Sequence, residues 1–222
     1  MRVDIWNIGD QEIEKIKAAI QKHEAIEFFS NTITREVEEN FQRVLVVFLT
    51  ECDQMHLFNC LSYCTLELLS NASKANAKRL YFKEQNLNIS SEKDYSSGME
   101  NFRAALCGNK IHYMNELESS LLQINLFLSN EGIMTVRVSN NTKITNTEYN
   151  RINEKLSMAK QYKNMEDAMS CVDQTEGSGL GLIIIVLMLR ELGLSENSLH
   201  FDTNEDETVA TIEIPVNTFA EI

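Results

Sequence analysis

The chain is short of proline, of cationic side chains and of long apolar runs. Pro215 is the single proline among 222 residues, so no proline-rich linker divides the sequence. Lysine and arginine number 20 against 33 acidic residues, a net charge of −13. This charge argues against a general nucleic-acid-binding protein, which needs a basic surface, but a local group of cations would suffice to hold a nucleotide. The longest apolar run, residues 180–189, is far shorter than the roughly 20 residues of a membrane span.

The five cysteines are odd in number and form no CxxC pair. Cys60 and Cys64 are one helical turn apart, as two metal ligands can be, but no group of histidines or acids accompanies them. We therefore interpret them as reduced residues of the core. No apolar signal segment follows Met1, and together these features predict a cytoplasmic protein.

Hydrophobic periodicity predicts mainly helices in the first third of the chain. Apolar residues three and four positions apart indicate two antiparallel helices over residues 10–52, interrupted at residues 30–32, with His23 on the first of them. A third helix is expected over residues 55–76. We assign residues 1–54 to an N-terminal helical segment that could contact a partner or form a homodimer, and residues 55–222 to the main domain.

Strands are predicted mainly in the remainder of the chain. Residues 121–128 and 134–139 flank a turn around Gly132 and indicate a hairpin. Further expected elements are an extended segment at 78–82, a loop over 86–97, helices at 98–106, 148–162, 165–172 and after residue 181, and a closing antiparallel pair at 199–201 and 208–214. This order predicts an α+β protein, with helices on one face of a mixed, mostly antiparallel sheet.

Three glycines at alternate positions, Gly177, Gly179 and Gly181, precede the most apolar segment of the chain. Such a backbone can approach a ligand closely because no Cβ lies in the way. A helix that starts there presents unpaired N–H groups to phosphates, and Gly193 and Arg190 suit its C-terminal end. Alone the pattern is a weak signal, since ordinary loops share it.

Glu67, Asn71 and Lys74 stand at positions i, i+4 and i+7 of the third predicted helix and therefore share one stripe. An acid, an amide and an amine together suit magnesium–triphosphate chemistry. The amide oxygen can ligate Mg²⁺, the ammonium group can neutralise phosphate, and the carboxylate can take a proton from the attacking nucleophile. The alternative is a solvated helix face with a favourable Glu–Lys pattern.

Taken together, residues 67–76 and 177–182 resemble the N-box and the second glycine box of the GHKL ATPase superfamily. This superfamily includes the catalytic domains of sensor histidine kinases, anti-sigma-factor kinases, DNA gyrase and the ninety-kilodalton heat-shock chaperone. The resemblance covers about residues 55–216 in the family's box order, and the glycine box is most similar to that of histidine kinases. It implies a two-layer α/β sandwich, the Bergerat fold, that binds ATP and Mg²⁺.

The resemblance also implies a role for each matching residue. Asn71 would bind Mg²⁺, Lys74 would bind the phosphates, and Glu67 matches the general base of ATP-hydrolysing members. Thr208 would lie near the adenine pocket, and residues 146–176 correspond to the ATP lid. The glycine box would bring the lid backbone to the triphosphate through Gly177, Gly179, Leu180 and Gly181.

The chain departs from the family pattern at its first glycine box. Asn140 stands where the family has an Asp that accepts a hydrogen bond from the adenine amino group. An asparagine oxygen can accept the same bond but carries no charge, so adenine binding is expected to be weaker or differently selective. Thr142 and Ile144 occupy the region of the missing glycines, and Glu207 replaces a glycine of the last box. Taken alone, Asn140 and Asn141 are typical of a turn that ends a strand.

The function implied is that of an ATP–Mg²⁺-binding, histidine-kinase-like domain of bacterial signalling. It would transfer the γ-phosphoryl group to a response regulator, phosphotransfer protein or other regulator, or hydrolyse ATP slowly. We expect the acceptor on another protein, because the residues after His23 lack the basic residue and proline of a histidine-kinase acceptor motif. The alternative is a non-catalytic, nucleotide-regulated binding module of the anti-sigma or partner-switching type, which the altered first glycine box favours.

Overall fold

The computed structural model describes residues 1–5, 8–171, 180–204 and 206–215. In this part of the chain, six strands form one mixed sheet: β1 (Arg2–Asp4), β2 (Ile26–Ser30), β3 (Ile124–Asn130), β4 (Ile133–Asn140), β5 (Leu199–Thr203) and β6 (Thr208–Pro215). They lie in the order β1-β2-β3-β4-β6-β5. The β1–β2 pair is parallel and the other neighbours are antiparallel, as expected for a mixed, mostly antiparallel sheet.

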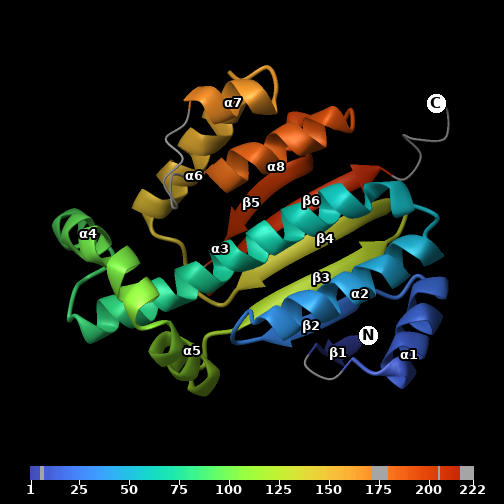
Figure 1. Cartoon of the computed structure of the whole chain (residues 1–222), viewed down its shortest axis with the longest axis horizontal. Coiled ribbons are helices and arrows are strands. Elements are labelled where there is room, and N and C mark those ends of the chain that lie inside the picture. Colours follow the sequence, from blue (N-terminus) through green and yellow to red (C-terminus); the bar gives the residue numbers. More distant parts are fainter. Residues whose placement is uncertain (6–7, 172–179, 205, 216–222) are drawn as a thin grey trace.

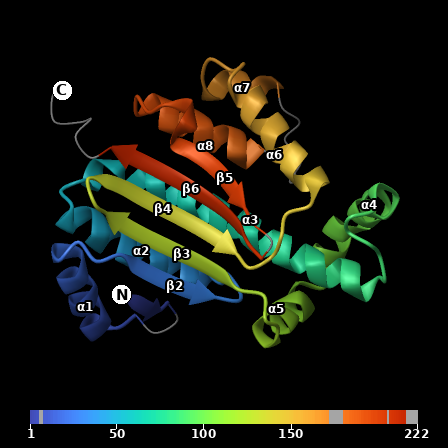
Figure 2. The same ribbon diagram turned by 180° about the vertical axis from the view of Figure 1, so that it is seen from behind.

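The helices of the described residues cover one face of this sheet, so the protein has two layers (Figure 1). Figure 2 shows the opposite sheet face with no helix across it. The helices are α1 (Asp10–Gln21), α2 (Arg35–Glu51), α3 (Phe58–Glu84), α4 (Glu92–Gly108), α5 (Lys110–Ser119), α6 (Asn146–Ala159), α7 (Met165–Cys171) and α8 (Leu180–Glu191). The α+β class is confirmed. No helix in the described ranges is long and apolar enough to cross a membrane.

The main hydrophobic core lies between the sheet and the helices. Phe28 and Val136 of the sheet and Phe41, Leu61 and Ile185 of the helices are all buried in it. Each large apolar side chain buried in this way contributes about 1.5–3 kcal/mol to the free energy of folding. Residues on both sides of position 54 therefore belong to the same core. Cys60 and Cys64 are also buried there, which confirms their interpretation as core residues.

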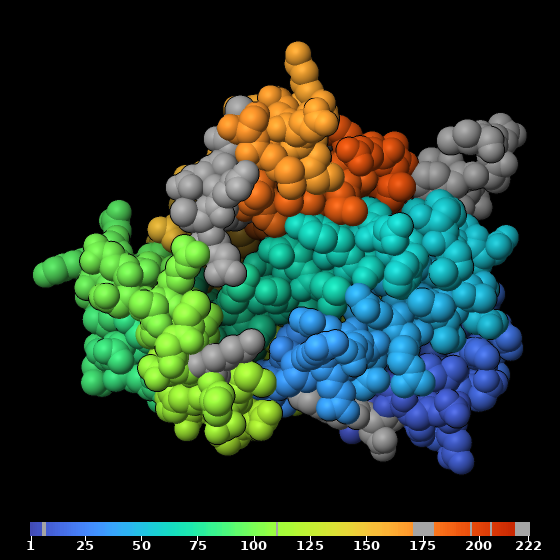
Figure 3. All heavy atoms as spheres, viewed as in Figure 1, coloured from blue at the N-terminus to red at the C-terminus, as the bar shows by residue number. Residues whose placement is uncertain are grey.

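A second, smaller hydrophobic cluster joins the end of α3 to α4 and α5. Its buried aromatic residues include Phe82 and Tyr95, whose ring centroids lie 5.9 Å apart, and Tyr81 and Phe102, at 5.4 Å. Gly98 allows α4 to approach closely, because a Cβ there would lie 2.5 Å from the Phe82 ring. In Figure 3, α3 runs across the helical layer, with α4 and α5 projecting at one end of it.

The N-terminal segment differs from its prediction. Ile26–Ser30 forms a strand instead of part of a helix, and Arg2–Asp4 forms another. Residues 1–54 are therefore not only helical, since they contribute two strands to the sheet. The burial of β2 alternates, as a strand requires, but five residues are too few to separate this pattern from helical spacing. His23 follows the end of α1 in a turn with a φ of 59°, so its placement on a helix was wrong.

The prediction of an extended segment at residues 78–82 was also wrong. The helix α3 continues through this segment to Glu84, because Tyr81 and Phe82 pack in the second cluster and tertiary contacts override their strand propensity. The helix α4 begins at Glu92, six residues before its predicted start, where the Ser91 hydroxyl accepts a hydrogen bond from the Asp94 N–H. The helix α5 was not predicted.

The predicted hairpin, the closing strand pair and the end of the apolar helix are confirmed. Strands β3 and β4 pair antiparallel around Gly132, which has a φ of +83°, and β5 pairs antiparallel with β6. Gly193 has a φ of +75°, and its N–H donates to the main-chain oxygen of Arg190 at 2.8 Å. A glycine at this position ends α8 without the steric cost that a Cβ would add.

Candidate functional site

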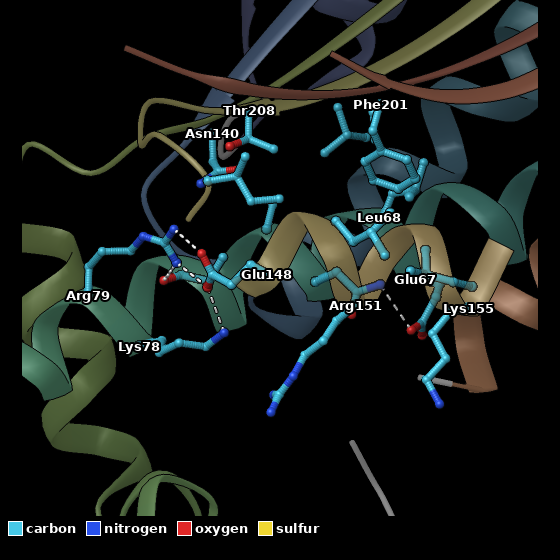
Figure 4. Close-up of a pocket in the computed structure, with 18 of the residues that line it drawn as sticks. Glu67, Leu68, Lys78, Arg79, Asn140, Glu148, Arg151, Lys155, Phe201 and Thr208 are labelled. Carbon is cyan, nitrogen blue, oxygen red and sulfur yellow. Dashed lines mark hydrogen bonds and ion pairs between the residues drawn. The ribbon is translucent and has the colours of Figure 1, made fainter. Parts of the chain in front are cut away.

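A cavity of about 530 Å³ lies between α3, α4, α6 and the sheet (Figure 4). Its volume falls within the roughly 300–1,000 Å³ typical of cofactor and substrate sites. The helix α3 forms one wall and α6 the other. The sheet residues that line it come from the middle and end of β4, the start of β6 and the middle of β5: Val138, Asn140, Phe201, Thr208 and Ala210.

The structure brings four of the predicted site residues together in this cavity. They are Glu67 and Asn71 on α3, Asn140 at the end of β4 and Thr208 at the start of β6. Lys74 is exposed and is not among the lining residues. Leu180 and Gly181 begin α8 beside the cavity without lining it. Gly177 and Gly179 lie outside the described residues.

Glu67 and Asn71 form a pair on the α3 wall. The Asn71 Nδ2 donates to Glu67 Oε1 at 3.2 Å, so the amide nitrogen is already engaged. The Asn71 Oδ1 is then the atom available to a cation, and oxygen is the ligand that Mg²⁺ prefers. In the described ranges, no three His, Cys, Asp or Glu side chains gather as a metal site. A magnesium ion here would therefore depend on oxygen atoms of a bound phosphate, its usual mode with nucleotides.

Gly181 leaves room for the Glu67 side chain because glycine has no Cβ. An ideal Cβ at Gly181 would lie 2.0 Å from Glu67 Oε1 and 2.8 Å from Glu67 Cγ, which is far inside van der Waals contact. The Glu67 side chain therefore occupies the space that any other residue at 181 would fill. The start of α8 thus helps to fix the carboxylate position on the cavity wall.

The floor of the cavity is a group of neutral polar side chains. Asn140 is only 5% exposed, and its Nδ2 donates to Asn76 Oδ1 at 3.1 Å and to the Thr142 hydroxyl. The Thr208 hydroxyl donates to the main-chain oxygen of Thr142 at 2.7 Å. No described residue donates a hydrogen bond to Asn140 Oδ1. The floor therefore offers a hydrogen-bond acceptor to a ligand that carries an N–H group.

A buried carboxylate, Glu148, fastens α6 to α3. Its two oxygens accept hydrogen bonds from Arg79 at 2.8 and 2.7 Å, and Lys78 Nζ lies 2.8 Å from Oε1. Burial alone would raise the pKa of Glu148, but the Arg79 hydrogen bonds and the charges of Lys78 and Arg79 lower it to about 2. Glu148 also accepts from the N–H of Thr145 at 3.0 Å in a capping box that starts α6.

Two more cations on α6 line the cavity. Arg151 stacks on the ring of Tyr95 at 4.9 Å, and its Nη1 donates to the Tyr95 hydroxyl at 3.4 Å. Lys155 also lines the cavity, and no carboxylate of the described residues pairs with it (Figure 4). Four lining cations thus face three lining carboxylates, Glu67, Glu148 and Glu154, which leaves one net positive charge. The cavity is therefore locally cationic within a chain of net charge −13.

Sequence reasoning missed these cations. Lys78 continues the stripe of Glu67 and Asn71 at position i+11, a signal that the incorrect extended assignment of residues 78–82 hid. Arg151 and Lys155 are four positions apart and therefore share one face of α6. Only the placement of α6 against α3 shows that this face is directed into a cavity.

Comparisons with known proteins show a likeness to an uncharacterized protein. No family model matches the chain, and no solved structure gives a significant match. An uncharacterized protein of Treponema pallidum (strain Nichols) is 34% identical over 209 residues, which are 93% of this chain and 40% of the relative. The chain therefore spans about two fifths of the length of that relative. The relative's name states no activity. The match therefore shows only that a similar sequence occurs within a longer protein.

Proposed function

We propose that the chain is an ATP–Mg²⁺-binding domain of the GHKL type with a Bergerat fold, most similar to the catalytic domain of histidine kinases. One observation carries the proposal: Glu67, Asn71, Asn140 and Thr208 line one cavity. These residues come from three segments that are far apart in the sequence, α3, β4 and β6, and the resemblance implies that all of them belong to one nucleotide site. A chance likeness of short motifs gives no reason for them to converge.

The distribution of charge in the cavity supports a nucleotide as its ligand. The floor combines the Asn140 acceptor with the apolar side chains of Val138 and Ala210, which suits a planar base that carries an amino group. Besides Lys78 and Arg79, which Glu148 pairs, the α6 wall carries Arg151 and Lys155, which suit phosphates. We place the base on the floor and the phosphates toward Asn71 and Lys155.

The residues present also fit a bound magnesium ion. Asn71 Oδ1 would hold it together with phosphate oxygens, and the ion would supply neutralisation of phosphate charge. Glu67 would accept the proton of an attacking water or hydroxyl, since its carboxylate lies on the same wall. Lys155 would bind phosphate oxygens in the role that the resemblance gave to Lys74. The γ-phosphoryl group would pass to a partner protein or, slowly, to water.

The non-catalytic alternative is favoured by one observation. Lys74, the lysine that matches the family's phosphate-binding residue, is exposed and does not line the cavity. A nucleotide held by the neutral floor and the α6 cations would then regulate binding to a partner, without transfer of its phosphate.

Calorimetric titration with ATP in the presence and absence of Mg²⁺ tests whether the chain binds the nucleotide. Measurement of ADP release distinguishes the catalytic form of the proposal from the non-catalytic binding module. Asn71→Ala should weaken Mg²⁺-dependent ATP binding by tenfold or more, because it removes the cation's protein ligand. Asn59→Ala is the matched control, since Asn59 is an exposed residue of the same helix and not among the lining residues. ATP binding without ADP release would contradict the catalytic form and support the non-catalytic binding module. No binding of ATP to the native chain would contradict both forms.

A further inference from the structure

Two buried amides meet at the cavity floor, one of which lines the cavity. Asn76, on α3, is 0% exposed, and its Oδ1 accepts a hydrogen bond from Asn140 Nδ2 at 3.1 Å. The Asn76 Nδ2 has no hydrogen-bond partner in the described part of the chain. Asn76 does not line the cavity itself. It acts on the cavity through its hydrogen bond with Asn140, which does line it. An unpaired buried donor costs free energy, and the bond that Asn76 accepts from Asn140 offsets part of the cost of burying this amide.

The bond from Asn140 to Asn76 decides which atom of Asn140 faces a ligand. An asparagine side chain ends in one acceptor and one donor group, and rotation of the amide exchanges them. Here Nδ2 is engaged by two oxygens, those of Asn76 and Thr142, and Oδ1 is left for the cavity. A carboxylate at position 140 would be an acceptor in either orientation, whereas an amide needs a neighbour to orient it.

We propose that Asn76 is a positioning residue that determines base specificity, an inference that rests on the proposed nucleotide function. It holds the Asn140 amide with Oδ1 toward the ligand, so that the site selects a purine with a 6-amino group over one with a 6-oxo group. A 6-amino group donates a hydrogen bond to Oδ1, whereas a 6-oxo group brings a second acceptor against it. The 6-oxo purine is accommodated only if both amides turn over together and the Thr142 hydroxyl becomes a donor.

The test compares ATP with inosine triphosphate, whose base carries a 6-oxo group in place of the 6-amino group. Calorimetric titration of the native chain with each, in the presence of Mg²⁺, should give roughly tenfold or greater preference for ATP. Asn76→Ala frees the Asn140 amide to rotate, so the preference should fall to less than about threefold. Asn125→Ala is the matched control, because Asn125 lies on β3 outside the cavity lining, and it should keep the native preference.

A second substitution separates orientation from a general loosening of the floor. Asn140→Asp makes the side chain an acceptor in both orientations, so the double variant Asn76→Ala/Asn140→Asp should regain the preference for ATP that Asn76→Ala alone loses. If Asn76→Ala does not give a native melting transition, the nearly isosteric Asn76→Leu replaces it. Leucine nearly fills the space of the asparagine but offers Asn140 no acceptor, so this variant should lose the preference for ATP as Asn76→Ala does.

The outcomes distinguish this inference from the function on which it rests. Equal affinity of the native chain for both nucleotides would leave the nucleotide site standing and overturn the role of Asn76. An unchanged preference in Asn76→Ala, or in Asn76→Leu where it replaces that variant, would overturn it in the same way. Failure of the native chain to bind either nucleotide would overturn the proposed function and this inference together.

Discussion

The floor and the walls of the cavity use different chemistry. The floor residues Asn140 and Thr208 are neutral and form hydrogen bonds with Asn76 and Thr142 behind them, whereas the walls carry lysine, arginine and glutamate side chains. Neutral hydrogen bonds depend on the geometry of donor and acceptor, and charges act over longer distances and respond to salt and pH. We therefore expect the floor to govern which ligand binds, and the walls to govern how tightly an anion is held and how firmly α6 is attached.

The largest effect expected on the walls is that of Glu148→Ala. It would leave Lys78 and Arg79 largely buried without their carboxylate and would remove the capping box of α6. We expect the free energy of unfolding to fall by about 3–5 kcal/mol, measured by denaturant titration. Glu154→Ala on the same helix is the control, and it should change stability by less than about 0.5 kcal/mol because Glu154 is exposed. Similar losses in the two variants would contradict the role of Glu148.

The carboxylate of Glu148 should also make the free energy of unfolding fall at acid pH. Its pKa in the folded chain, about 2, lies below the ordinary value of 4.5, so its contribution is present above pH 4.5 and is lost as the pH falls toward 2. The shift corresponds to at most about 3 kcal/mol. Denaturant unfolding of the native chain and of Glu148→Gln between these pH values should show a steeper loss for the native chain. Parallel curves would rule out this contribution.

Gly181→Ala should impair the proposed site while leaving the stability of the fold nearly unchanged. The added Cβ collides with the flexible end of Glu67, so the carboxylate must move while the helices stay in place. We expect ADP release to fall by about tenfold, as a misplaced base does, with a change in stability below about 1 kcal/mol. Gly108→Ala, where a Cβ meets nothing within 4 Å, is the control. A large loss of stability in Gly181→Ala would show that the residue serves packing and not the site.

The smallest effect expected is that of a single wall cation. Lys155→Ala should weaken ATP binding about fivefold at low salt and less at high salt, because it removes one charge from the phosphate side of the cavity. Lys74→Ala should leave the affinity nearly unchanged, since Lys74 lies outside the lining. Calorimetry at two salt concentrations measures both. A larger loss in Lys74→Ala would return the phosphate-binding role to the residue that the resemblance assigned.

The sequence predicted best the features that depend on local pattern. The β3–β4 hairpin follows from alternation around Gly132, and the end of α8 follows from Gly193, whose positive φ a glycine adopts without strain. The Glu67–Asn71 pair follows from helical spacing. Each of these signals lies within one short continuous stretch of sequence, where backbone geometry alone determines which side chains are neighbours.

The remaining features depend on contacts between distant segments. The extension of α3 through Tyr81 and Phe82 depends on the cluster that α4 and α5 complete. The Glu148 bridge joins residues about 70 positions apart, and the bond between Asn76 and Asn140 spans a similar separation. No local pattern marks these partners, because each side chain alone is compatible with a solvated surface.

The length of α3 has a mechanical consequence. Its 27 residues make a rod of about 40 Å, with one end anchored in the main core and the other in the aromatic cluster of α4 and α5. Glu67 and Asn71 stand on the turns of the helix that pack in the main core, and Lys78 stands on the turns that pack in the aromatic cluster. Because one continuous helix carries all three, it fixes the spacing along the cavity wall between the Glu67–Asn71 pair and Lys78.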